Sequence, residues 1–358
     1  MPGKLSSTTF APVAVIGAGH IAHQHVGALC EVVGPENVSV SDLSPVLAEA
    51  MADRYALAGW YTDFRAQLEA QKPKVCHVTT PAPTHYFIAK ACLEAGASVV
   101  IEKPATESME QLEELLALAD SKGLHLVEDQ NYPWNIEVVN LVDKMRRGEL
   151  GDICHVEVHI TLNIIGKGSR YVDKNAPHPS VNEPGGAVSD FLTHLVSLAH
   201  PFVGNHKEVK TVWRKDSTAP IPFDEFRCLA DCERGTAALV FSARSQPDGF
   251  WLKVWGTEGQ AACSMWEPRT VLHKKYGGMP ALTPLRNAAA DALQLALRGP
   301  NSLVRKLSGG PGPYQGLWRL VERTYTALDA GAPLPIDHHT VRGVNQWVHA
   351  VLEEVPEP

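Results

Sequence analysis

Short apolar runs alternate with longer mixed segments through residues 13–127 of the chain. Runs such as 13–16 (Val-Ala-Val-Ile) and 98–101 (Ser-Val-Val-Ile) have the length and composition of buried strands. This alternation predicts a parallel, doubly wound α/β sheet. The expected strands are 13–16, 37–42, 60–61, 75–79, 98–101 and 124–127, and the expected helices are 20–33, 85–95, 109–122 and one that begins near Pro45.

The pattern changes after a helix expected at 136–147. In residues 154–162 the even positions are largely apolar and the odd positions polar, which predicts a strand with one wet face and hence an antiparallel sheet. The Gly- and Pro-rich stretch 299–313 is expected to be a surface loop. Further strands are expected near 209–214, 226–232, 236–244 and 250–255, hairpin turns at 233–235 and 257–259, and closing helices at about 315–330 and 341–353.

The composition is that of a globular protein, with 44% hydrophobic and 20% charged residues among 358. The formal net charge of −8 is spread along the chain without a basic block, which argues against nucleic acid or an anionic membrane as a partner. Residues 1–9 lack an apolar segment, and no run approaches the ~18 apolar residues of a membrane span. We therefore expect a soluble, cytoplasmic protein.

The seven cysteines are scattered, and their odd number in a long chain predicts reduced, mostly buried thiols. Cys228 and Cys232 lie four residues apart, but no matching second pair follows. On a strand this spacing places both side chains on one face, so we interpret them as packing residues and expect no metal site.

The run Gly17-Ala18-Gly19-His20-Ile21-Ala22 follows the first strand and opens the first helix. Gly17 allows a tight turn, Gly19 lets a pyrophosphate approach the backbone, and Ala22 keeps strand and helix close together. The helix start points unpaired N–H groups and the positive end of its dipole toward a bound anion. The context of strand, turn and helix favours a dinucleotide site over a plain tight turn.

Asp42 ends the second strand, where a dinucleotide fold places the carboxylate that binds the adenosine ribose. The alternative is that Asp42 only caps the helix that begins near Pro45. An acid at this position repels a 2′-phosphate, and no Arg or Lys follows until Arg54. NAD is therefore favoured over NADP.

Two further groups could carry acid–base chemistry. Lys103 follows the fifth strand, at the sheet edge where ligands bind, so its ammonium could reach nicotinamide and substrate; the alternative is a solvated loop lysine. Asp190 and His194 are four residues apart on one face of a predicted helix, so the carboxylate can raise the proton affinity of the imidazole. Such a pair suits proton transfer to or from a hydroxyl, although a surface pair has the same spacing.

The ordered set of motifs resembles the glucose–fructose oxidoreductase/inositol dehydrogenase (Gfo/Idh/MocA) family over essentially the whole chain. The resemblance implies an N-terminal Rossmann domain (residues 1–131) and a C-terminal α/β domain (132–358) with an open, mostly antiparallel sheet. That sheet often forms the oligomer interface, so a homodimer or homotetramer is expected. The motifs are Gly17–Ala22, Asp42, Thr80-Pro81 with His85, Glu102-Lys103-Pro104, 148–151, Gly185-Gly186 with Asp190 and His194, and 256–259.

The resemblance also implies an NAD-dependent oxidoreductase acting on a secondary alcohol or ketone of a sugar, cyclitol or related polyol. Lys103 would hydrogen-bond the reacting oxygen, His194 would be the general acid/base, and Asp190 would be its partner and a substrate contact. The cofactor-binding residues would be Gly17, Gly19, His20, Ile21, Ala22, Asp42, Thr80, Pro81, His85, Glu102, Lys103 and Asn131.

The chain also departs from the family pattern. Many relatives carry an Arg shortly after the sixth strand, whereas this chain reads Glu128-Asp129-Gln130-Asn131-Tyr132-Pro133-Trp134, in which Asn131 could still face the cofactor. The polar loop 163–184, which includes Tyr171 and His178, could contact substrate, act as a lid or be plain surface. His20, His23 and His25 are expected at the helix surface or the cofactor edge. Alternative functions are a redox-neutral glycosidase or lyase that retains NAD, or a non-catalytic NAD-sensing regulator.

Overall fold

The computed structural model describes residues 9–173, 175, 178–266, 269–274, 280–307 and 312–357. By packing, the chain divides into two compact units. The first consists of 1–131 with 316–345, and the second of 132–315 with 346–358. The sequence analysis assigned all of 132–358 to one domain; in the structure, most of α9 (Gln315–Ala330) and the first half of α10 (His338–Glu353) pack with the first unit.

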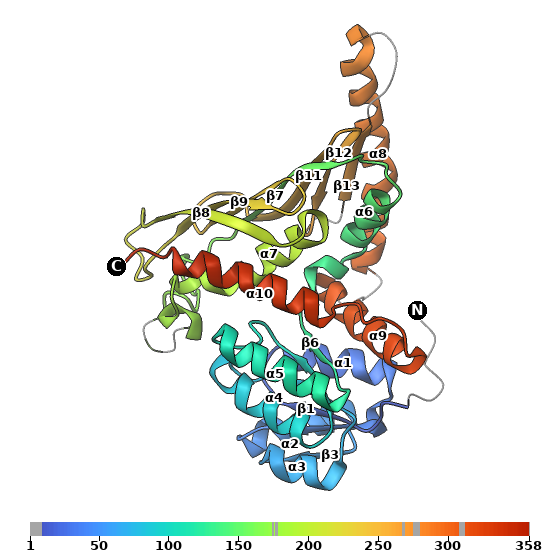
Figure 1. The fold of residues 1–358 in the computed structure, drawn as a ribbon, viewed down its shortest axis with the longest axis vertical. Coiled ribbons are helices and arrows are strands. Elements are labelled where there is room, and N and C mark those ends of the chain that lie inside the picture. The colour runs from blue at the N-terminus through green and yellow to red at the C-terminus, as the bar shows by residue number, and fades with distance from the viewer. Residues whose placement is uncertain are drawn as a thin grey trace. The chain divides into compact units, whose positions relative to one another are not determined.

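A six-stranded sheet in the order β3-β2-β1-β4-β5-β6 forms the centre of the first unit (Figure 1). All its strand pairs are parallel, which confirms the predicted doubly wound sheet. Every residue of β1, β2, β4, β5 and β6 is buried, as expected for strands covered on both faces. The strands are β1 (Val13–Ile16), β2 (Val38–Ser41), β3 (Gly59–Tyr61), β4 (Val75–Val78), β5 (Ser98–Ile101) and β6 (Leu126–Glu128).

Five helices connect these strands, and α4 packs against α5 while α1 packs against α2. They are α1 (Ala22–Val32), α2 (Pro45–Tyr55), α3 (Phe64–Gln71), α4 (His85–Glu94) and α5 (Met109–Lys122). The side chains of Ser44, Asp63 and Ser108 accept hydrogen bonds from the first turns of α2, α3 and α5, so the sequence encodes these helix starts locally.

The last two helices are fixed to the first unit by polar and close-packed contacts. Trp318 of α9 lies against Gly27 of α1, where a Cβ atom would lie 2.8 Å from the indole ring. Asn345 of α10 donates a hydrogen bond to the buried carboxyl group of Glu128 (2.9 Å), and Arg342 pairs with Glu113 (2.6 Å). These contacts explain why residues 316–345 belong to the first unit.

The second unit contains a seven-stranded sheet in the order β13-β12-β11-β7-β10-β9-β8 (Figure 1). β7 and β10 are parallel and the other neighbours antiparallel, which confirms the expected mostly antiparallel sheet. β12 and β13 were not expected from the sequence. The strands are β7 (Ile153–Thr161), β8 (His206–Arg214), β9 (Glu225–Cys232), β10 (Thr236–Ser242), β11 (Gly249–Gly256), β12 (Gly259–Ser264) and β13 (Arg269–Lys274).

In the described part of this sheet, the side chains on one face are buried and those on the other face are half-buried or exposed. Val156, Val158 and Ile160 of β7 are buried, and α7 (Ser189–Val203) packs against β7, β10 and β11. α6 (Ile136–Arg146) contacts α7 and β12, and α8 (Thr283–Leu307) contacts β13. The alternation predicted from residues 154–162 is therefore confirmed.

The loop expected at 299–313 is partly wrong. Residues 299–307 continue α8, residues 312–314 form a 3₁₀ turn, and 308–311 lie outside the described residues. The Gly-Pro pair at 299–300 favours a loop in the sequence, because an interior proline removes one helix hydrogen bond and costs about 3 kcal/mol.

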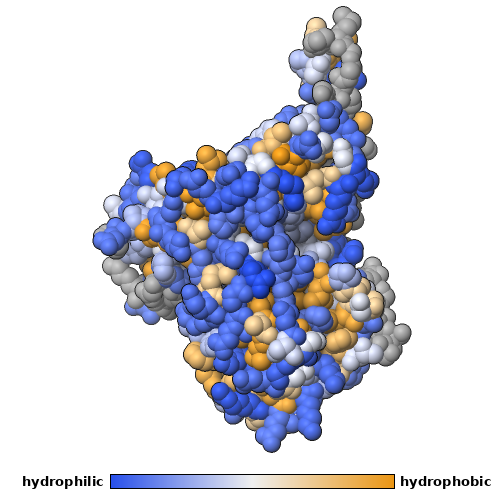
Figure 2. Space-filling model, viewed as in Figure 1, coloured by the Kyte–Doolittle hydropathy of each residue, from blue (hydrophilic) through white to orange (hydrophobic). Residues whose placement is uncertain are grey.

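All seven cysteines are free, and five of them are buried, as the sequence predicts. Cys228 and Cys232 lie on the same buried face of β9. Among the described residues, no helix has the length and apolar character needed to cross a membrane. The face shown in Figure 2 is largely hydrophilic, with smaller hydrophobic patches on it.

Candidate functional site

The glycine turn after β1 is held by close backbone contacts. Gly17 has φ +102°, and a Cβ atom there would lie 2.9 Å from the carbonyl carbon of Thr79. The N–H of Gly17 donates to the carbonyl of Ser41 (2.7 Å), and the hydroxyl of Thr79 donates to the carbonyl of Gly17 (2.9 Å). Gly17 is therefore required by the fold itself.

Gly19 has a different environment. It is exposed, and a Cβ atom there would meet no protein atom within 4 Å. Packing does not explain a glycine at this position, whereas close approach of a ligand does. Helix α1 starts beside it at Ala22, and no side chain caps its N-terminus at Ile21. The first-turn N–H groups are thus suited to a phosphate anion, and the residues fit the dinucleotide that the sequence predicts.

Asp42 connects this turn to the end of β2. Its Oδ2 accepts a hydrogen bond from the N–H of Ala18 and its Oδ1 from the N–H of Ser44, both at 2.8 Å. The cap of α2 is Ser44, whose hydroxyl accepts from Leu47. The alternative in which Asp42 only caps α2 is therefore excluded.

A pocket of about 450 Å³ lies beside the glycine turn in the first unit. Two of its apolar residues are unusually exposed, since Leu43 is 93% and Phe87 64% accessible. Exposed apolar side chains that flank a pocket suit a flat aromatic ring. Arg65, on α3, is a lining residue that the sequence analysis did not identify. The other lining residues include Gly17, Asp42, Thr80 and Pro81, four of the predicted cofactor residues.

His85 joins two loops at the carboxyl edge of the sheet. Its Nδ1 lies 2.8 Å from the carbonyl oxygen of Pro104 and its Nε2 2.7 Å from that of Thr80. Burial lowers the pKa of His85, although both carbonyls favour the protonated ring. Its ring is 1% exposed and both nitrogens face backbone, so it holds the loops rather than presenting a polar atom to a ligand.

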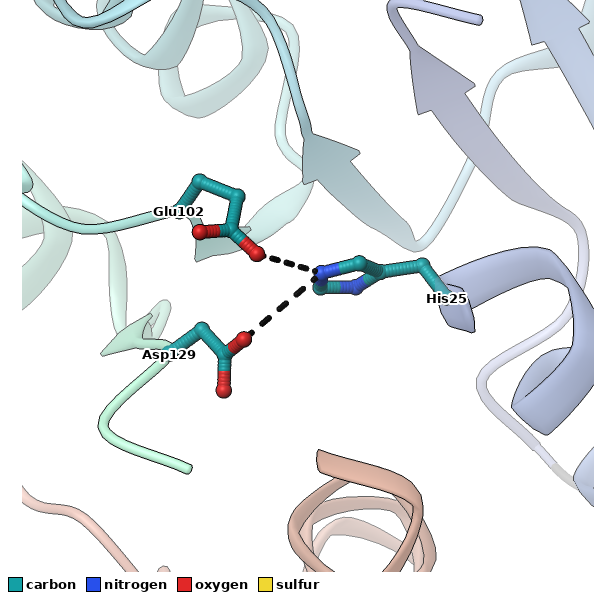
Figure 3. A group of neighbouring side chains, drawn as sticks. All are labelled: His25, Glu102 and Asp129. Atoms are coloured by element: carbon teal, nitrogen blue, oxygen red, sulfur yellow. Dashed lines mark hydrogen bonds and ion pairs between the residues drawn. The ribbon is translucent and has the colours of Figure 1, made fainter. Parts of the chain in front are cut away.

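His25, Glu102 and Asp129 form a buried cluster at the carboxyl ends of β5 and β6 (Figure 3). Nε2 of His25 lies 3.1 Å from Oε1 of Glu102 and 3.9 Å from Oδ2 of Asp129. The side chain of His25 is 1% exposed, so of its two expected placements, helix surface and cofactor edge, the helix surface is wrong. Asp129 is a functional candidate that the sequence analysis did not assign.

The two carboxyl groups of this cluster have opposite pKa shifts. Burial raises the pKa of Glu102, but the hydrogen bond from His25, the charges of His25 and Lys103, and the bond with Asp129 together hold it below its ordinary value. Burial, followed by the charge of Glu102, raises the pKa of Asp129 well above its ordinary value. The two shifts therefore place the shared proton of the pair on Asp129, with Glu102 as its acceptor.

Glu128 is a third buried carboxyl group next to this cluster. Its Oε1 accepts from the N–H of Ala105 (2.9 Å), and its Oε2 accepts from the amides of Gln130 (2.7 Å) and Asn345 (2.9 Å). Burial raises its pKa despite these bonds. The donors come from three segments, so Glu128 joins them.

The donor atoms of His25, Glu102 and Asp129 lie within 4.8 Å of one another, a spacing that a divalent cation could use. His25 and Glu102 are, however, already at hydrogen-bond distance, and the positive charge of Lys103 acts on both carboxyl groups. The contact between His25 and Glu102 therefore needs no ion, although Oδ1 of Asp129 is buried without a hydrogen-bond partner.

The second unit holds the other predicted acid–base pair, on α7. The hydroxyl of Tyr171 donates to Oδ2 of Asp190 at 2.5 Å, and Nε2 of His178 lies 4.0 Å from the same oxygen. Burial, followed by the charge of Asp190, raises the pKa of Tyr171. The ring of Tyr132 lies edge-on to His194, with centroids 4.7 Å apart. Two residues of the polar loop 163–184 thus lie beside Asp190.

The pKa of Asp129 gives a prediction on stability. Below the ordinary Asp pKa of 3.8 the carboxyl group is protonated in both states, whereas above it the unfolded chain loses a proton that the folded chain keeps. This residue therefore lowers stability increasingly as pH rises. Asp129→Asn keeps a donor for Glu102 without the ionisation, so its Tm should exceed that of the wild type by a few degrees at pH 7–8 and converge with it near pH 4.

Differential scanning calorimetry across this pH range tests the effect, with Asp53→Asn on the exposed side of α2 as the matched control. A Tm difference for Asp129→Asn that is independent of pH, or that shrinks as pH rises, would contradict the assignment of a protonated Asp129.

Comparisons with known proteins agree with this architecture. Residues 11–130 match the model of the GFO_IDH_MocA oxidoreductase family with an NAD-binding Rossmann fold. The D-glucoside 3-dehydrogenase of Escherichia coli (strain K12) is 34% identical over 151 residues, 41% of this chain and 43% of that protein. The D-apiose dehydrogenase of Paraburkholderia graminis is 23% identical over 271 residues, 74% of this chain and 70% of that protein.

The crystal structure of GenD2 from gentamicin A biosynthesis, in complex with NAD, has a TM-score of 0.74 and 20% identity, covering 99% of this chain and 97% of that chain. A likeness at this level of identity establishes the fold. The chain spans less than half of the glucoside dehydrogenase that it matches, so that protein's substrate is a property of the relative. Residues 11–130 therefore form the NAD-binding Rossmann domain of the Gfo/Idh/MocA oxidoreductase family.

Proposed function

We propose that this protein is an NAD-dependent oxidoreductase that transfers a hydride between nicotinamide and a secondary alcohol or ketone of a sugar, cyclitol or related polyol. The observation that carries the proposal is the space at Gly19 beside the uncapped start of α1. A glycine whose missing side chain serves no packing purpose is expected where the backbone must approach a pyrophosphate.

The pocket beside this turn is proposed to take the adenosine half of the cofactor. Leu43 and Phe87 offer apolar surface to the adenine, and Asp42 stands at the end of β2, where a ribose would bind. The carboxylate of Asp42 disfavours a 2′-phosphate, whereas Arg65 in the same pocket would tolerate one. We propose NAD as the preferred nucleotide because Asp42 is fixed by two backbone donors, while Arg65 is exposed.

We propose that Lys103 and His194 act on the same substrate oxygen. In the oxidative direction His194 removes the hydroxyl proton, and the ammonium of Lys103 stabilises the negative charge that develops on the oxygen. NAD, when bound, accepts the hydride from the substrate carbon. In the reductive direction His194 returns the proton to the oxygen.

Asp190 is proposed to orient His194 and to contact the substrate. Its position is supported by Tyr171, whose hydroxyl donates to Oδ2 of Asp190 at 2.5 Å, and by His178, whose ring stacks on that of Tyr171. The two loop residues fix the carboxylate on the face of α7 that carries His194.

The substrate class rests on the relatives. The glucoside 3-dehydrogenase and the apiose dehydrogenase both act on sugars by name, and this chain is similar to each. A secondary alcohol of a sugar or polyol has the oxygen and the carbon-bound hydrogen that Lys103, His194 and NAD together require.

We also propose that the protein is a homo-oligomer that assembles through the outer face of the seven-stranded sheet. Leu229 and Val212 are more than half exposed on β9 and β8. Trp251 and Trp255 of β11 lie over histidines of β7, with ring centroids 5.6 and 5.4 Å apart. An open sheet face with this many apolar side chains is suited to burial against a second copy.

The two glycines of the turn should respond differently to the same substitution. Gly19→Ala adds a methyl group in open space, so it should leave the Tm unchanged and weaken NAD binding about tenfold or more. Gly17→Ala forces a methyl group against the Thr79 carbonyl at positive φ, so it should lower the Tm as well. Calorimetric titration with NAD and thermal denaturation measure both; wild-type NAD affinity in Gly19→Ala would contradict the phosphate site.

The catalytic assignment predicts that Lys103→Ala and His194→Ala each lower kcat by about two or more orders of magnitude while NAD still binds. The substrate for this assay comes from a screen of sugars, cyclitols and their keto forms, followed by the absorbance of reduced nicotinamide. Lys122→Ala, at the exposed end of α5, and His200→Gln, in the last turn of α7, are the matched controls. Turnover close to wild type in both Lys103→Ala and His194→Ala would refute the assignment.

The assembly proposal predicts that a charge at the centre of the outer face separates the subunits. Ala238 pairs with Glu157 of β7 and Leu229 of β9, so Ala238→Arg places a cation in the middle of this face. Light scattering after size-exclusion chromatography should show a lower mass than for the wild type, whereas Ala66→Arg on exposed α3 should not change the mass. A wild-type mass for Ala238→Arg would exclude this face as the interface.

A further inference from the structure

A chain of buried side chains leads from Glu102 into the interior of the first unit. Nδ1 of His25 lies 2.9 Å from Nδ1 of His77, and Nε2 of His77 lies 3.1 Å from the hydroxyl of Tyr325. With the 3.1 Å contact between His25 and Glu102, these form an unbroken series of hydrogen bonds. The members come from α1, β4, α9 and the end of β5, and the two histidines and the tyrosine are at most 1% exposed.

The chemistry of these groups fixes the direction of the hydrogen bonds. Burial, followed by the charge of His25, lowers the pKa of His77 well below its ordinary value, so His77 carries one N–H. If Tyr325 donates to Nε2 of His77, then His77 donates from Nδ1 to His25, and His25 donates from Nε2 to Glu102. This assignment gives each nitrogen of the two imidazoles one hydrogen-bond partner and leaves the carboxylate of Glu102 as the final acceptor. The hydroxyl of Tyr325 thus determines which nitrogen of His25 carries its proton.

The opposite direction of donation leaves one buried group without a hydrogen-bond partner. It requires a second proton on His25, and it turns Nε2–H of His77 toward the oxygen of Tyr325. The tyrosine O–H would then need another acceptor, and the hydrogen bonds found for it among the described residues go to His77 alone. A buried hydroxyl proton without an acceptor is costly.

Titratable groups from every neighbouring element surround this series of hydrogen bonds. They favour the same direction of donation, from Tyr325 toward Glu102. Lys103 adds a positive charge beside Glu102, and Asp129 adds a proton that it shares with Glu102. Burial, followed by the charges of Cys76 and Asp329, raises the pKa of Tyr325, so it keeps its proton. The remaining groups are Cys92 and His85 of α4 and Glu128 of β6.

Glu102 lies on the half of the sheet that would meet the second half of a dinucleotide. The pyrophosphate turn follows β1 and Asp42 follows β2, so the adenosine lies over β1 to β3 and the nicotinamide over β4 to β6. A nicotinamide ring is cationic when oxidised and neutral when reduced. An ionised carboxylate held on that half therefore interacts differently with the two forms.

We propose that Tyr325, His77 and His25 are positioning residues that hold the carboxylate of Glu102 at the nicotinamide end of the site, so that the protein favours NAD⁺ over NADH. This inference rests on the proposed function, because it requires that the chain bind the dinucleotide. It assigns a role to three residues that neither touch the substrate nor belong to the glycine turn.

Two substitutions of His25 separate positioning from packing. Gln places an amide N–H as far along the side chain as Nε2 of His25, so His25→Gln can still donate to Glu102. Asn ends at the distance of Nδ1, so His25→Asn keeps the contact with His77 but loses the one with Glu102. Tyr325→Phe removes the terminal hydroxyl, and its matched control is Tyr86→Phe, whose hydroxyl donates to Glu114 on the surface.

The readout is the ratio of the Kd values for NADH and NAD⁺, measured by calorimetric titration without substrate. We expect His25→Asn to shift this ratio toward NADH by roughly three- to tenfold, the size of one partly screened charge interaction, and Tyr325→Phe to shift it in the same direction. His25→Gln should stay within about twofold of the wild type, and Tyr86→Phe should leave the ratio unchanged.

Several results would overturn the proposal. An unchanged ratio in His25→Asn, or equal shifts in His25→Asn and His25→Gln, would show that Glu102 is not positioned through Nε2 of His25. One equivalent of zinc bound by the wild type and lost in His25→Gln would assign the cluster to a metal instead. A wild-type protein that binds neither NAD⁺ nor NADH would refute the proposed function itself, and that titration is done first.

Discussion

The ionised carboxylate of Glu102, buried at the end of β5, imposes the strictest requirement on the first unit. A buried charge costs several kcal/mol unless neighbouring groups compensate for it. Here the compensation comes from His25 of α1, Lys103 of the following loop and the protonated carboxyl group of Asp129 after β6. These groups lie on three separate segments, so the compensation depends on the folded arrangement of the helix and both strand ends.

The same requirement explains why the last helices belong to the first unit. Buried polar groups need partners, and the sheet alone does not supply enough of them. Tyr325 of α9 completes the hydrogen bonds of His77, and Asn345 of α10 donates to Glu128. Residues more than two hundred positions away in sequence therefore supply hydrogen-bond partners to His77 and Glu128. Residues 316–345 accordingly pack with the first unit.

The parts of the fold that depend on local pattern could be predicted from the sequence. The strands of the first unit, the glycine turn and α5 follow from runs, spacing and caps within a few residues. The role of His25 could not be predicted. The helical period shows that His23 and His25 lie on different faces of the helix, but it does not show which face packs against the sheet. The roles of Asp129 and Tyr325 could not be predicted for a related reason, because each interacts with a partner that is distant in sequence.

The candidate residues of the two units are held in place by different means. In the first unit, the charge of Lys103 lowers the pKa of the buried carboxyl groups of Glu102 and Asp129, whereas burial raises it. In the second, Asp190 is held by Tyr171 from a polar loop, whose contacts no periodic pattern predicts. A loop residue such as Tyr171 can be substituted without disturbing the buried network of the first unit, because loops tolerate sequence change better than packed cores do.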